Sequence, residues 1–164
     1  MNNSLWIDSS IQTNYPNLEN NVSTDVCIIG GGITGTAIAY MLLGNNLDIT
    51  IIDKDKMCMG VSANSTGKIT SQHGLFYDYL INSYDSSFAK KYLESNEQAI
   101  KNIYDIVNKE NIDCDFEFQD SFVFTQIETE LEKIKKEVTA VNSLGFNETF
   151  EKNIYLPIDV LRFN

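Results

Sequence analysis

The sequence predicts an α/β protein that opens with a strand–helix–strand unit. Three observations lead to this prediction. Asp25 leads into a short apolar run, three spaced glycines follow it, and residues 47–52 alternate between apolar and polar side chains before two isoleucines and Asp53 end the segment. A strand, a helix and a second strand in this order form a βαβ unit, in which the two strands are parallel.

The glycines after the first run have a specific spacing. Gly30, Gly32 and Gly35 fit the pattern G-x-G-x-x-G, in which the first makes a tight turn, the second lets phosphates approach the backbone, and the third lets the helix pack on the strand. Ile33 and Thr34 begin the helix, where free N–H groups and the positive dipole end face an anion. The pattern is typical of a Rossmann-like dinucleotide site; a Gly-rich turn in another strand–turn–helix unit is the alternative.

The next elements agree with this interpretation. We expect a helix over residues 33–43, ended by Gly44 and two asparagines that tolerate left-handed backbone. The second strand ends at Asp53, about 20 residues past the glycines, where a Rossmann unit places the carboxylate that binds a ribose. Residues 54–74 then form a polar loop, and a loop of this length in a compact domain is usually functional or disordered.

Two amphipathic helices are expected further along. Apolar residues recur at helical spacing over residues 86–108 and again over residues 128–143. Gly145 is expected to end the second helix, and Glu132 and Lys136 are spaced as an i,i+4 ion pair.

Aromatic residues alternate between these helices. Phe116 and Phe118 precede a turn, and Phe122 and Phe124 follow it, which predicts two short strands. Their aromatic side chains are interpreted as sheet core, and the alternative is that one face lines a pocket over a flat ring. Short edge segments are expected over residues 146–150 and 154–157.

Composition limits the classes of function. The 164 residues suffice for one domain or one and a half, and 43% of them are apolar. Twelve basic against 23 acidic residues give a net charge of −11, which disfavours nucleic acid and anionic membranes as partners. Three cysteines without C-x-x-C spacing predict neither a disulfide framework nor a metal site. Glycines interrupt the apolar stretch over residues 26–43, so we expect no membrane span, and a cytoplasmic protein is the natural expectation.

The sequence resembles a known family. Residues 25–35, the strand end at Asp53 and the loop over residues 60–68 resemble the FAD-dependent oxidoreductases of the D-amino-acid oxidase and glycine oxidase type, which have the glutathione-reductase-like flavoprotein fold. Residues 64–79 are similar to a bacterial subgroup in which some members carry a C-terminal Rieske iron–sulfur domain. The resemblance implies FAD as cofactor and oxidation of an amine or amino acid substrate by hydride transfer to the flavin.

The resemblance also implies cofactor-binding residues, although no catalytic residue can be named. Asp53 would hold the adenosine ribose, Lys54 would lie beside the adenosine, and Lys68 would favour the anionic reduced flavin; a solvated loop lysine is the alternative for Lys68. His73 is expected to have a structural or supporting role, and attachment of the flavin, which some relatives make through a histidine, is the alternative. The remaining expected contacts are with the pyrophosphate, from Gly30, Gly32, Ile33, Thr34, Gly35 and Ser62, and with the flavin end, from Asn64, Thr66 and Lys68.

We expect three segments in an incomplete enzyme. Residues 1–24 form an N-terminal arm whose residues 5–7 can dock on the body, residues 25–75 an FAD-binding Rossmann-like segment, and residues 76–164 a helical segment with part of an α+β substrate domain. Because the family interleaves its domains along a longer chain, we expect an N-terminal fragment with weak or absent FAD retention, no turnover alone, and self-association or aggregation through uncovered sheet. The alternatives are an NAD(P)-binding Rossmann module and a catalytically inactive interaction module.

Overall fold

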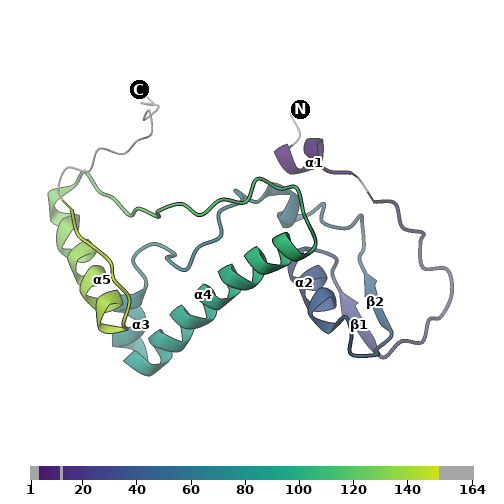
Figure 1. Cartoon of the computed structure of the whole chain (residues 1–164), viewed down its shortest axis with the longest axis horizontal. Coiled ribbons are helices and arrows are strands. Elements are labelled where there is room, and N and C mark those ends of the chain that lie inside the picture. The colour runs from purple at the N-terminus through teal and green to yellow at the C-terminus, as the bar shows by residue number, and fades with distance from the viewer. Residues whose placement is uncertain (1–3, 12, 152–164) are drawn as a thin grey trace. The chain divides into compact units, whose positions relative to one another are not determined.

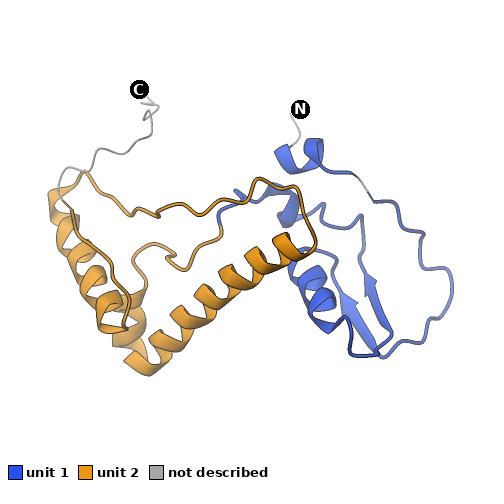
Figure 2. Ribbon diagram, in the orientation of Figure 1, with its two compact units in different colours: residues 1–68 blue, residues 69–164 orange. Residues whose placement is uncertain are grey.

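The protein combines helices with a small parallel sheet, in agreement with the predicted α/β class (Figure 1). The computed structural model describes residues 4–11 and 13–151. The chain divides into two compact units, residues 1–68 and residues 69–164 (Figure 2).

Unit 1 contains the predicted strand–helix–strand arrangement. Strand β1 (Val26–Ile29) pairs in parallel with β2 (Ile49–Ile52), and helix α2 (Ile33–Leu42) connects them. A left-handed turn at Gly44 and Asn46, with φ of 85° and 55°, leads from α2 toward β2, as the sequence predicts. The unit also holds a short N-terminal helix, α1 (Leu5–Ser9), and a 3-10 helix, η1 (Val61–Asn64), within the polar loop.

Unit 2 is built from helices around one apolar cluster. Helix α4 (Ser86–Lys109) and helix α5 (Leu131–Ser143), which follows the 3-10 helix η2 (Glu128–Glu130), confirm the two expected amphipathic helices. Helix α3 (Tyr77–Ser83) was not predicted, and it packs against both of them. The buried cluster comprises Tyr77, Leu80, Ala89, Leu93, Ala140, Val141 and Leu144.

A buried carboxylate joins α3 to α5. Glu137 is only 4% exposed, and its Oε1 accepts hydrogen bonds from the backbone N–H groups of Phe76 and Tyr77, both at 2.8 Å. Its Oε2 accepts from the N–H of Asp78 at 2.9 Å, and Gln72 Nε2 donates to Oε1 at 2.7 Å. Phe76, the residue before α3, offers no side-chain cap, so Glu137 supplies the acceptors that the start of this helix needs.

Tyr77 lies next to this carboxylate in the core. Burial, and then the nearby Tyr92 and Glu137, raise the pKa of its phenol above the usual value of 10.0. The hydroxyl therefore stays protonated at neutral pH, and it donates a hydrogen bond to the carbonyl oxygen of Ser71.

The predicted aromatic strands are wrong. The structure describes no strand over residues 113–127; Phe116 and Phe118 pack instead on the ring of Tyr104, with centroids 5.7 and 5.0 Å away. Phe124 remains 68% exposed. A strand requires a hydrogen-bonded neighbour, and this segment has none within the described part of the chain.

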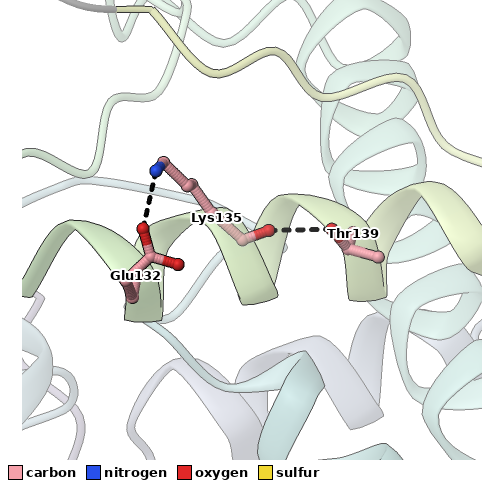
Figure 3. Close-up of polar contacts among 3 residues, drawn as sticks. All are labelled: Glu132, Lys135 and Thr139. Atoms are coloured by element: carbon pink, nitrogen blue, oxygen red, sulfur yellow. Dashed lines mark hydrogen bonds and ion pairs between the residues drawn. The ribbon is translucent and has the colours of Figure 1, made fainter.

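The predicted edge segments and the predicted surface ion pair differ from what the structure describes. Residues 146–150 contain no strand, and residues 154–157 lie outside the described residues. Glu132 pairs with Lys135 at 2.6 Å, one position earlier than predicted, and Thr139 donates to the carbonyl oxygen of Lys135 at 2.9 Å (Figure 3). Residues at i+3 and i+4 both neighbour residue i on a helix, so spacing alone did not decide between the two lysines. Gly145 does end α5, with φ of 96°.

We predict that Glu137→Ala lowers the free energy of unfolding by about 3 kcal/mol, because it leaves three backbone N–H groups at the start of α3 without their acceptor. Glu137→Gln retains one carbonyl oxygen and should lose less. Urea denaturation followed by circular dichroism measures both variants. Equal stability of Glu137→Ala and the original protein would contradict this role.

Candidate functional site

The turn between β1 and α2 is tight enough to require glycine at two positions. Gly30 has φ of 106°, a left-handed backbone value that other residues rarely adopt. A Cβ on Gly35 would lie 2.0 Å from the carbonyl oxygen of Gly30 and 3.2 Å from Cγ2 of Ile28. Helix α2 therefore packs directly on the end of β1, as expected for the third glycine of the pattern.

The first N–H group of α2 is bound by a side chain from the polar loop. Gly32 precedes the helix and has no side chain to cap it. Ser62, in η1, accepts a hydrogen bond from the N–H of Ile33 at 2.9 Å. A Cβ on Gly32 would lie 3.0 Å from Ser62 Oγ, so the missing side chain at residue 32 leaves room for this approach.

Asp53 is anchored to the glycine turn from the end of β2. Its Oδ2 accepts a hydrogen bond from the N–H of Gly31 at 2.7 Å, and its Oδ1 accepts one from Asp55 at 2.9 Å. These bonds, that to Gly31 first, lower the pKa of the exposed carboxyl below its usual value of 3.8. Asp53 is thus ionised at neutral pH and fixed beside the turn.

A cavity of about 440 Å³ lies within unit 1 beside these groups. This volume is in the range of small-molecule sites. Four of the predicted residues contribute to its wall: Gly32, Asp53, Lys54 and Ser62. The sequence interpretation missed the others, which are Asp55, Lys56, Cys58, Met59, Gly60 and Val61.

The missed residues belong to a turn that folds back on the glycines. The N–H of Cys58 donates to the carbonyl oxygen of Gly31 at 2.9 Å, and Cys58 has left-handed backbone with φ of 60°. The alternating acids and lysines over residues 53–56 were a possible signal for this wall, because charged residues directly after a parallel strand lie at the edge where ligands bind.

The other predicted residues fall in two groups. Gly30, Ile33, Thr34 and Gly35 belong to the turn and the first residues of α2, next to the cavity wall. Asn64, Thr66 and Lys68 are exposed and are not among the lining residues; the Asn64 amide donates to the carbonyl oxygen of Gly60 at 3.0 Å. Their placement at a flavin stays a prediction.

His73 lies in unit 2, where its ring and that of Tyr92 form a T-shaped pair with centroids 6.5 Å apart. Within residues 4–11 and 13–151, no cluster of three or more His, Cys, Asp or Glu side chains could hold a metal ion. None of the helices described is both long and apolar enough to cross a membrane.

Comparison with known proteins identifies the family. The model of the FAD dependent oxidoreductase family (DAO) matches residues 25–153. The chain therefore belongs to this family, in agreement with the resemblance carried by its glycine turn. No solved structure is a significant match.

Three curated proteins are similar to this chain. The "Putative Rieske 2Fe-2S iron-sulfur protein YhfW" of Bacillus subtilis is 34% identical over 153 residues, which are 93% of this chain and 30% of that protein. The gamma-glutamylputrescine oxidoreductase of Escherichia coli is 24% identical over 62% of this chain and 24% of its own length. The probable oxidoreductase OrdL of Rhizobium meliloti is 25% identical over 68% of this chain and 26% of its own length. The chain thus spans less than a third of each relative.

We predict that Gly35→Ala destabilises unit 1 by at least about 2 kcal/mol, because its Cβ would overlap the carbonyl oxygen of Gly30 at the strand end. The control is Gly60→Ala, whose Cβ would meet no atom within 4 Å. Thermal unfolding of both variants measures the difference. A melting temperature for Gly35→Ala equal to that of Gly60→Ala would show that α2 does not need this close approach.

The bond between Asp53 and Gly31 predicts a specific titration. The carboxyl of Asp53 should titrate below 3.8, and the amide shift of Gly31 should follow the same midpoint. Since the pKa is lower in the folded state, any stability from this bond is present above the unfolded pKa and is lost as pH falls through the folded pKa. NMR titration of the Asp53 carboxyl and the Gly31 amide measures this midpoint; a midpoint for Asp53 at or above 3.8 would contradict the bond.

Proposed function

We propose that this chain forms the N-terminal part of an FAD-dependent enzyme and binds the adenosine and pyrophosphate end of FAD in the cavity of unit 1, in a Rossmann-like arrangement. One observation carries the proposal. The start of α2, Ser62 and the anchored carboxylate of Asp53 meet at the wall of one cavity. These are a phosphate-binding helix start, a hydroxyl donor and a ribose acceptor at neighbouring positions.

The residues fit the chemistry of this cofactor. A helix start attracts a pyrophosphate through its N–H groups and dipole, and Gly32 presents backbone without a side chain in the way. Ser62 can donate its hydroxyl hydrogen to a phosphate oxygen while it accepts from Ile33. Asp53 is ionised and accepts hydrogen bonds, as contact with ribose hydroxyls requires, and Lys54 lies in the same wall.

The flavin, when bound, supplies the capacity to accept a hydride from substrate, and the protein binds and orients it. An amine or amino acid is the proposed substrate class, supported by the name of the gamma-glutamylputrescine oxidoreductase to which this chain is similar. Asn64, Thr66 and Lys68 are proposed to face the flavin end, since they continue the chain from Ser62 along the same loop.

The complete enzyme is proposed to extend further than this chain. The relative named as a Rieske protein is matched over 30% of its length, which supports a Rieske domain in a longer parent chain.

Ile29 and Ile33 are 85% and 69% exposed in unit 1, so we propose self-association when these surfaces are not covered. A cytoplasmic location and the division into residues 1–24, 25–75 and 76–164 belong to the same proposal.

An FAD titration tests the proposal. Gly32→Val should abolish binding, because a branched side chain would occupy the backbone approach and collide with Ser62. Asp53→Ala removes a charged acceptor worth about 1.5–3 kcal/mol, so the FAD dissociation constant should rise about tenfold to a hundredfold. Flavin fluorescence measures both variants.

Asp113→Ala is the matched control for this titration, since it makes the same chemical change on an exposed residue of unit 2. The FAD dissociation constant of Asp113→Ala should equal that of the original chain. Tight binding of NAD without binding of FAD would refute the proposed function and favour an NAD(P)-binding module.

A further inference from the structure

The N-terminal helix α1 contacts the loop that carries Ser62. The hydroxyl of Ser4 donates a hydrogen bond to the carbonyl oxygen of Ala63. Trp6 Nε1 donates to the carbonyl oxygen of Ser65 at 2.6 Å. Both bonds join residues 59 positions apart, so they fix a distant segment of unit 1 rather than the helix itself.

The Trp6 ring also lies close to Gly67 in this loop. A Cβ on Gly67 would be 2.7 Å from Cζ2 and 3.0 Å from Cη2 of Trp6. Gly67 has φ of 75°, so both the backbone conformation and the contact require glycine. Trp6 is 38% exposed, and Cζ2 and Cη2 are the ring atoms nearest to Gly67.

These contacts continue to the start of α2. Ala63 is buried at 4% exposure and directly follows Ser62, whose hydroxyl caps Ile33. Ser65, which receives the Trp6 bond, donates its own N–H to the carbonyl oxygen of Ser62 at 3.4 Å. Helix α1 therefore acts on Ser62 through backbone groups of the loop at residues 63 and 65. The family match begins at residue 25, so α1 lies outside it.

We propose that α1 is a clamp for the cofactor-binding loop over residues 61–68, and that Trp6 is a positioning residue that keeps Ser62 against the start of α2. The link to FAD rests on the proposed function. A polar loop whose residues 64–68 are all exposed gains little from burial, so holding it in one conformation opposes its backbone entropy. The bond to Ser65 and the ring on Gly67 provide that restraint.

Hydrogen–deuterium exchange of the full chain tests the clamp without any cofactor. In Trp6→Ala, amides of residues 61–68 should exchange at least about tenfold faster, while those of β1 keep their rates. Trp6→Phe keeps a ring but loses the bond to Ser65, so its exchange rates should lie between those of Trp6→Ala and the original chain. Because it keeps the ring, it tests the clamp even if Trp6→Ala does not fold. Ile11→Ala is the control, because this residue is 96% exposed and lies outside α1. Unchanged exchange over residues 61–68 in both Trp6 variants would overturn the clamp.

Trp6 is the single tryptophan of the chain, so its emission reports on the contact directly. Gly67→Ala should push the ring away from the loop and shift its emission to longer wavelength, whereas Gly60→Ala, with open space around its Cβ, should not. The same emission from Gly67→Ala and the original chain would count against the ring contact.

FAD affinity separates the clamp from the proposed function. If the original chain binds FAD, Trp6→Ala should raise the dissociation constant at least about fivefold, because the loop must then be ordered on binding. Equal FAD affinity of Trp6→Ala and Ile11→Ala would show that Trp6 does not position the loop for FAD. If the original chain does not bind FAD, the proposed binding of FAD by this chain alone fails, and the exchange measurement still decides whether α1 restrains the loop.

Discussion

The contact of Gly35 with the carbonyl of Gly30 is the constraint on which unit 1 depends. Because no side chain separates them, α2 begins close to the end of β1, and Gly32, the residue before α2, lies in the cavity wall. The same tight turn leaves the N–H of Gly31 free for Asp53 and its carbonyl for Cys58. One close approach therefore places the strand end, the helix start and the cavity wall together.

The N–H donors of the glycine turn bind acceptors of different charge. Asp53 and a pyrophosphate are both negative, so they repel one another if they share a donor. The structure commits the N–H of Gly31 to Asp53, while the N–H of Ile33 meets an uncharged hydroxyl from Ser62. Lys54 and Lys56 in the same wall reduce the repulsion that remains. The arrangement thus suits a ligand with hydroxyls at one end and phosphate beside them.

The sequence predicted those parts of the fold that depend on residues close together in the chain. The glycine spacing, the left-handed turn after α2 and the position of Asp53 all follow from short stretches of chain. The alternating phenylalanines over residues 116–124 misled because alternation describes one strand, whereas a strand forms only beside a partner. The part of the cavity wall after Lys54, over residues 55–61, was missed because the backbone bond of Cys58 to Gly31 leaves no periodic signal in the sequence.

Asp53 and Glu137 both show that the sequence does not reveal which distant backbone groups a carboxylate binds. Each is a carboxylate that accepts backbone N–H groups at a turn or helix start, but Asp53 acts 22 residues away within one βαβ unit, and Glu137 acts 60 residues away on Tyr77. A glutamate three residues after Ile134 and four before Val141 lies on the apolar face of α5, where a charge requires a partner. The sequence thus signals that Glu137 is bound, but only the tertiary contact between α3 and α5 shows what it binds. Helix α3 was missed because the carboxylate that caps its start comes from another helix.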